Sequence, residues 1–157
     1  MYIIYGKDFF ETSKENIFTI FEMANLSMFK KDPPIILGNN IEGALLLQIA
    51  LQNLDGPLIK AAIGDILTNV HSRLKEQPMS KTFHRVLIGV FLSAMLTDVN
   101  VTLEFLAHVG FLEEFFVILR DLWKTFRLSY ERKVYALAIS NFIFNSNMPS
   151  QLQNVAA

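Results

Sequence analysis

The sequence contains no cysteine. Disulfide bonds, thiolate catalysis and cysteine-ligated zinc are therefore excluded together, and the absence fits a reducing compartment. The chain also lacks an excess of either charge, because 14 basic and 15 acidic residues give a net charge of −1, and its pI is about 6.3. The densest basic cluster, Arg127 with Arg132 and Lys133, is typical of a solvated helix face. Nucleic-acid binders usually carry a basic patch and a high pI, so direct nucleic-acid binding is not expected.

Long apolar runs are missing as well. The longest, residues 86–96, has 11 residues including a serine, whereas a membrane-spanning helix needs about 20. A second run, residues 111–123, is interrupted by four charged residues. The first fifteen residues lack the basic and apolar regions of a secretory signal. We therefore expect no membrane insertion, and we interpret the glycosylation-like triplets at Asn25 and Asn100 as chance occurrences.

Catalytic and cofactor motifs are absent too: there is no nucleophile elbow and no glycine-rich phosphate loop. Glu104 lies four residues before His108, so the two can share a helix face, but two ligands do not make a metal site. Glu113 and Glu114 are adjacent and diverge on a helix, which is typical of a polar edge. The remaining histidines are His71 and His84. We predict no catalytic, cofactor-binding or metal-binding residues, no cofactor, and a protein that is not an enzyme.

What the sequence does contain is apolar residues at helical spacing. Hydrophobic residues make up 52% and charged residues 18% of the 157 residues, which excludes disorder for most of the chain and allows one domain with a substantial core. The sole strand-like run, residues 1–5, is too short to make a sheet. The pattern therefore predicts an all-α fold. The expected helices are residues 7–28, 40–54, 57–76, 80–96, 101–109, 111–126 and 130–145.

Short polar breaks separate these segments and supply helix signals. Capping by side-chain oxygens is expected at the N-terminal ends, and glycine in the left-handed conformation at one C-terminal end. Gly43, Gly64 and Gly89 fall inside helices, where each costs about 1 kcal/mol relative to alanine. We interpret these three as sites where helices approach closely. The expected caps are Asp55, Ser80, Asp98 or Asn100, Ser129, and, at a C-terminal end, Gly110.

Connections of two to five residues make successive helices antiparallel neighbours. Paired helices then give a unit of about 40 residues, which suits HEAT or armadillo repeats. The many aromatic residues, 14 of them phenylalanine, suit helices that bury two faces. We predict an α-solenoid of antiparallel HEAT-like pairs over residues 1–157, with residues 146–157 as an irregular tail. A closed helical bundle is the competing architecture.

Two segments carry a resemblance to a known family. Residues 41–74, IEGALLLQIALQNLDGPLIKAAIGDILTNVHSRL, are similar to late repeats of importin-beta-type karyopherins. Residues 115–143, FFVILRDLWKTFRLSYERKVYALAISNFI, fit that family better, with Arg132-Lys133, Leu137 and Ile143 at matching positions. The sequence resembles most the importin-seven/eight branch near the C-terminal end of its long solenoid. The resemblance covers about two-thirds of the chain.

The resemblance implies a fragment of a nuclear transport receptor, shared between cytoplasm and nucleus and found at nuclear pores. Its implied partners are protein cargo, the GTPase Ran and phenylalanine-glycine nucleoporins, with the Ran-binding part chiefly toward the receptor's other end. No protein-binding residue carries over by motif, and a capping or inter-repeat role is expected for Arg132 and Lys133. The alternatives are a HEAT or armadillo scaffold subunit of another assembly, or a small regulatory helical bundle.

Overall fold

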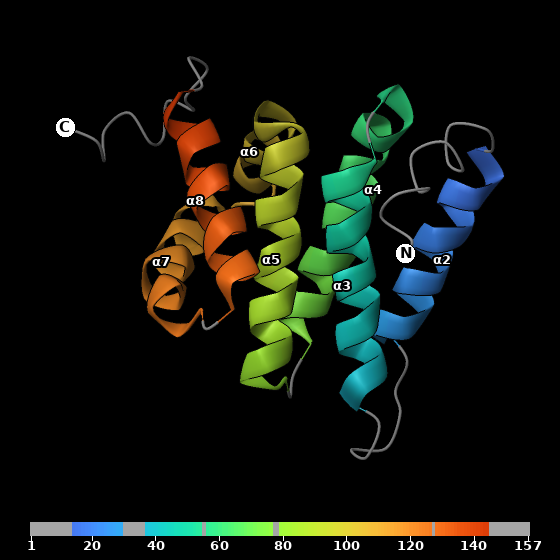
Figure 1. Cartoon of the computed structure of the whole chain (residues 1–157), viewed down its shortest axis with the longest axis horizontal. Coiled ribbons are helices and arrows are strands. Elements are labelled where there is room, and N and C mark those ends of the chain that lie inside the picture. Colours follow the sequence, from blue (N-terminus) through green and yellow to red (C-terminus); the bar gives the residue numbers. More distant parts are fainter. Residues whose placement is uncertain (1–13, 30–36, 55, 77–78, 127, 145–157) are drawn as a thin grey trace.

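The computed structural model describes residues 14–29, 37–54, 56–76, 79–126 and 128–144, and within these ranges all regular structure is helical (Figure 1). The predicted all-α class is confirmed, and no described helix has both the length and the apolarity to span a membrane. Residues 7–13 of the first expected helix, the cap Asp55 and the tail 146–157 lie outside the described residues. The elements are α2 (Lys14–Phe29), α3 (Leu37–Asn53), α4 (Pro57–Lys75), α5 (Lys81–Thr97), α6 (Val99–His108), α7 (Leu112–Leu122), the 3₁₀ helix η2 (Trp123–Thr125) and α8 (Ser129–Ile143).

Three of the expected helix signals are confirmed. The Ser80 hydroxyl accepts a hydrogen bond from the backbone N–H of Phe83 at 3.1 Å, and the Asp98 carboxylate accepts one from Val101 at 3.1 Å. Each side chain thereby satisfies a donor that the first helical turn leaves unpaired. Gly110 has a φ of 68°, in the left-handed region that glycine adopts without a steric penalty.

Two expected boundaries near the C-terminal end are wrong. Ser129 is the first residue of α8, and the N-cap is Leu128, whose backbone N–H donates to the Glu131 carboxylate at 3.1 Å. The expected helix 111–126 ends at Leu122 and tightens into η2. There the Thr125 hydroxyl donates to the carbonyl of Leu122 at 2.7 Å, a local bond that competes with α-helical pairing.

Helices α3, α5 and α8 form a row and run in the same direction (Figure 1). The hydrogen bonds between α3 and α5 show this parallel alignment, because Gln48 donates to the carbonyl of Val86 and Gln52 to the hydroxyl of Ser93, each at 2.7 Å. On the other side, Asn141 of α8 donates to the carbonyl of Met95 in α5 at 2.7 Å. These three bonds fix the register of the row.

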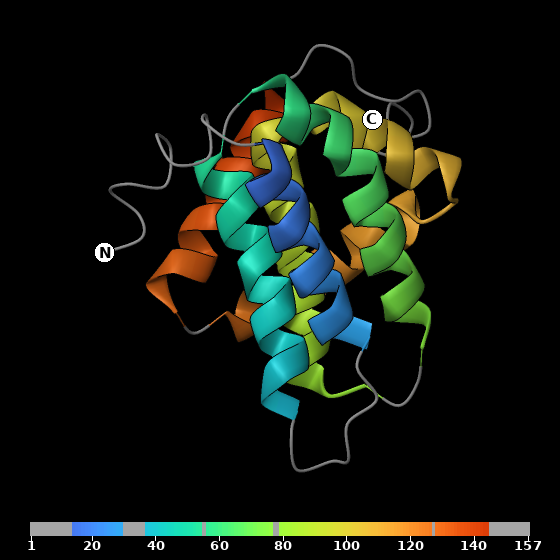
Figure 2. The ribbon, with the colours of Figure 1, turned by 90° about the vertical axis from the view of Figure 1, so that its right-hand side faces the viewer.

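The remaining helices cover this row. Helix α2 lies at one end, against α3 and α4, as Figure 2 shows from that side. Helices α4, α6 and α7 form a second layer behind α3, α5 and α8 (Figure 1). The two layers are compatible with both a stacked and a closed arrangement, so the solenoid stays a prediction.

Two of the three helical glycines lie where helices approach closely, as expected. A Cβ at Gly43 would lie 2.7 Å from the carbonyl oxygen of Ala24 in α2, and one at Gly89 would lie 2.5 Å from the amide nitrogen of Gln48 in α3. The expectation is wrong for Gly64, which has nothing within 4 Å of such an atom. Because the two glycines bring α2 and α5 so near to α3, these helices, and not the consecutive α4, are the main neighbours of α3.

The core between the two layers contains an aromatic cluster around Phe91. Phe91 of α5 is fully buried, and its ring centroid lies 5.6 Å from that of Phe115, 6.0 Å from Phe111 and 6.5 Å from Phe105. Core packing therefore accounts for these phenylalanines, as expected. Trp123, in contrast, is 55% exposed.

Candidate functional site

Two adjoining hollows lie along the N-terminal half of α5, where α4, the α6–α7 connection and α7 pack beside it. They share one lining residue, His84. Because they meet at this residue, we call the two hollows together the α5 groove. The first hollow is lined by His71, Leu74, Lys75, His84, Val109, Gly110, Phe111, Glu114 and Ile118; the second is lined by Met79, Lys81, Thr82, His84, Arg85, Leu122, Lys124 and Thr125.

The first hollow has a volume of about 210 Å³. The turn that ends α6 builds one wall, because Phe111 N–H donates to the carbonyl of Leu106 at 2.9 Å and Gly110 N–H to that of Ala107 at 3.1 Å. This pair of bonds is the Schellman arrangement, which needs the left-handed glycine. It turns the chain so that Phe111 is buried beside His71, with ring centroids 5.2 Å apart. The hollow thus has an aromatic base within partly polar walls.

Two histidines face the first hollow, and burial lowers the pKa of both. For His71 the loss of solvent is the larger cause, Lys75 lowers the pKa further, and Glu114 raises it. For His84 burial again lowers the pKa, opposed by Glu114. Both imidazoles are therefore held preferentially in the neutral form. No sequence pattern groups these two residues, which are thirteen positions apart on different helices.

We expect the fold to lose stability in mild acid because of these two groups. Because the pKa of each histidine is lower in the folded chain than in the unfolded chain, the unfolded chain binds more protons as the pH falls below about 6.5. The free energy of unfolding is therefore highest above that pH and declines below it. Thermal unfolding between pH 7.5 and pH 5.5 should show this decline, with a shallower slope in His71→Asn. The control variant is His108→Asn, at an exposed position of α6. An unchanged slope in His71→Asn would contradict the conclusion that burial of His71 causes the decline.

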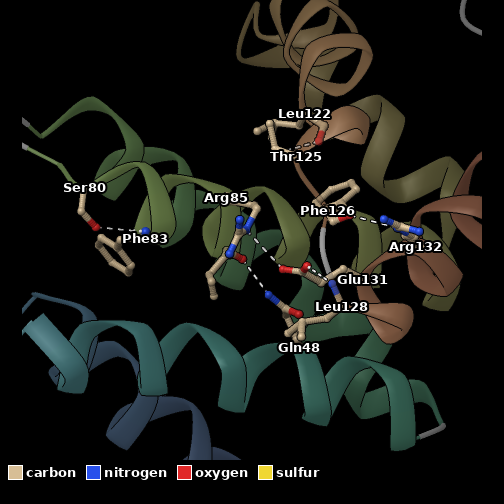
Figure 3. A network of polar contacts seen from close by, with 11 residues as sticks. Gln48, Ser80, Phe83, Arg85, Leu122, Thr125, Phe126, Leu128, Glu131 and Arg132 are labelled. Carbon is tan, nitrogen blue, oxygen red and sulfur yellow. Dashed lines mark hydrogen bonds and ion pairs between the residues drawn. The ribbon is translucent and has the colours of Figure 1, made fainter.

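The second hollow has a volume of about 740 Å³ and a positively charged wall. Lys81 and Lys124 are exposed, whereas Arg85 is held by an ion pair with Glu131 of α8 (Figure 3). The Arg85 Nε atom lies 3.2 Å from a carboxylate oxygen of Glu131, which is an ion-pair distance without hydrogen-bond alignment. Glu131 is only 9% exposed and also accepts the N–H of Leu128. One carboxylate thus joins α5 to the start of α8.

The residues that the sequence singled out lie elsewhere or have structural roles. Arg132 donates from Nε to the carbonyl of Phe126 at 3.0 Å, which stabilises the α7–α8 connection as expected, and Lys133 is exposed. Glu104 and His108 are both exposed on α6, away from the groove. Of the adjacent Glu113 and Glu114, the latter alone lines the groove. Among the described residues, no three His, Asp or Glu side chains are grouped to hold a metal ion.

The basic wall of the second hollow was not predicted, because its residues are far apart in the chain. Lys81 and Arg85 lie in α5, whereas Lys124 lies in η2, and only the packing of α7 beside α5 brings them together. The four-residue spacing of Lys81 and Arg85 was the one local signal, since it places both on one face of a helix.

No protein-family model, curated protein or solved structure matches this chain. The karyopherin resemblance therefore stays a prediction, and the function has to be inferred from the fold and the groove.

Proposed function

We propose that this chain is part of a protein-binding scaffold of stacked helices, and that the scaffold is a nuclear transport receptor of the importin-beta type. The observation that carries the proposal is the distribution of exposed apolar side chains. The helices in the middle, α4, α5 and α6, contribute no large exposed hydrophobic residue among the described residues. With the exception of Ile49, those residues belong to the two ends of the row: Phe18, Met23 and Leu26 at α2, and Val117, Trp123, Leu128, Tyr130, Leu137, Ile143 and Phe144 at α7, η2 and α8.

Exposed apolar side chains on the outermost helices of an array are expected where those helices pack against further units. In a helical-repeat scaffold each unit contacts its neighbours through its two ends and leaves the sides of the stack for partners. Both ends of this row have the required apolar character. The parallel alignment of α3, α5 and α8 supports the same architecture, because corresponding helices of successive repeats lie side by side.

The transport assignment is supported by the position of the best-matching segment. Residues 132–143 of the resemblance fall in α8, at one end of the row. Arg132 caps the connection before α8, and Ala138 is fully buried, as repeat-forming positions require. Leu137 and Ile143 are 47% and 62% exposed, so they are available to a following repeat.

The first hollow of the α5 groove supplies a surface for phenylalanine-glycine repeats. The resemblance implies that such repeats contact apolar pockets between outer helices. The hollow lies between α4 and α7 of the second layer, with Phe111 at its base and Leu74, Val109 and Ile118 in its walls. Its volume of about 210 Å³ has room for one aromatic side chain.

The proposal is tested by affinity capture with the complete natural reading frame that contains this chain. Immobilised phenylalanine-glycine repeats and Ran, loaded with GTP or with GDP, are the baits, and serine-glycine repeats are the control. A transport receptor is retained by the phenylalanine repeats and by Ran in the GTP form only. Retention by neither bait would refute the transport assignment and favour a scaffold subunit of another assembly.

A further inference from the structure

The second hollow of the α5 groove is unusual in its charge. Three of its lining residues are the cations Lys81, Arg85 and Lys124, and no carboxylate lines it. This local excess stands out in a chain with a net charge of −1. A cleft lined by one sign of charge raises the local concentration of oppositely charged ligands.

Within the part of the chain that the structure describes, two of the three positive charges of this hollow have no carboxylate partner. Among the described residues, neither Lys81 nor Lys124 forms an ion pair with a carboxylate. Arg85 already has Glu131 as a partner, which fixes the guanidinium in place at the wall. A fixed cation loses less side-chain entropy on binding than a mobile one, so the wall is partly preorganised.

The shape and the apolar lining favour a peptide over a small anion. The hollow of about 740 Å³ falls within the range of about 300–1,000 Å³ typical of ligand sites. Met79 and Leu122 add apolar surface to the basic wall, and His84 connects it to the aromatic base of the first hollow. A chain segment with acidic residues beside an apolar side chain matches both parts of the groove.

We propose that the second hollow binds an acidic peptide segment of a partner protein, with its carboxylates at Lys81, Arg85 and Lys124. The inference rests on the proposed function only in taking the chain as a protein-binding scaffold, and it specifies the partner's charge. A long polyanion such as a nucleic acid is a poorer match. A nucleic acid usually needs an extended basic surface and a high pI, whereas the second hollow has three cations in a chain with a net charge of −1.

The test uses a fluorescent ten-residue peptide with five glutamates around one phenylalanine, and its counterpart with five lysines. Titration by fluorescence anisotropy should show saturable binding of the acidic peptide alone. In the double variant K81E/K124E the acidic peptide should bind about tenfold more weakly, because two exposed charge pairs are replaced by repulsion. The matched control K60E/K133E makes the same change of net charge at exposed lysines outside the groove, and it should bind like the wild type.

Several outcomes would overturn the inference: equal binding of both peptides, equal weakening by the control variant, absence of binding, or tighter binding of a single-stranded oligonucleotide than of the acidic peptide. Phenylalanine-glycine repeats are titrated in parallel to separate this inference from the transport proposal. Binding of those repeats with no preference for acidic peptide would overturn the inference alone. Binding of the acidic peptide without the repeats would support the inference and count against the transport assignment.

Discussion

Replacement of Phe91 by alanine is expected to lower the free energy of unfolding by about 3–5 kcal/mol, the usual range for a buried aromatic residue. Phe91 has no solvent-exposed surface, and its ring contacts three other phenylalanines from α6, the α6–α7 connection and α7. Removal of the ring leaves a cavity where the two layers meet. The surrounding rings are themselves packed on each other, as Phe111 and Phe115 are at 6.2 Å, so they fill the space only in part.

Urea unfolding followed by circular dichroism at 222 nm measures this loss. The control is Phe144→Ala, at a position that is 86% exposed, where a change of at most about 0.5 kcal/mol is expected. A loss below about 1 kcal/mol for Phe91→Ala would be too small for an aromatic core residue, and would mean that α5 is not packed against α6 and α7 as described.

The second large effect is a contrast between two glycine-to-alanine substitutions. In α3, a Cβ at Gly43 would lie 2.7 Å from the Ala24 carbonyl oxygen and 2.9 Å from the Ser27 Cβ, so α2 has to move away. In α4, a Cβ at Gly64 meets open space. Overpacking costs about 1–3 kcal/mol, whereas alanine gains about 1 kcal/mol over glycine in a helix interior.

Gly43→Ala should therefore be destabilised by about 1 kcal/mol, the difference between these two effects, and Gly64→Ala stabilised by about 1 kcal/mol. Both variants add one methyl group inside a helix. They differ only in whether a neighbouring helix lies against that methyl group. Equal midpoints of unfolding in the two variants would show that α2 does not approach α3 at this point.

Local signals were sufficient for the fold class and for most helix ends. Ser80 and Asp98 cap helices as their chemistry predicts, because an N-cap bond involves residues only three positions apart. Ser129 was misassigned because the competing cap involves Glu131, which is also held by Arg85 of α5. The contact of Glu131 with Arg85 outweighed the local preference for serine at the N-cap position.

The site could be predicted from the sequence only in small part. A capping or inter-repeat role was expected for Arg132 and Lys133, and Arg132 forms such a cap with the Phe126 carbonyl six residues away, whereas Lys133 is exposed. The α5 groove was not predicted, since it depends on which helices lie beside α5, and helical periodicity says which face is buried without saying against what. The same limit explains Gly64: like Gly43 it lies inside a helix, but no atom of a neighbouring helix lies within 4 Å of the position a Cβ would take.

The most direct measurement of the central claim is an equilibrium titration of this chain with a phenylalanine-glycine repeat segment and its serine-glycine counterpart. The proposed transport receptor binds the phenylalanine segment saturably and does not bind the serine segment. Ile118→Asn, in the wall of the first hollow, should weaken this binding about tenfold, which corresponds to a loss of about 1.4 kcal/mol. Val117→Asn, at an exposed position next to it in α7, should leave the binding unchanged. Equal binding of the two segments, or no binding of either, would contradict the claim.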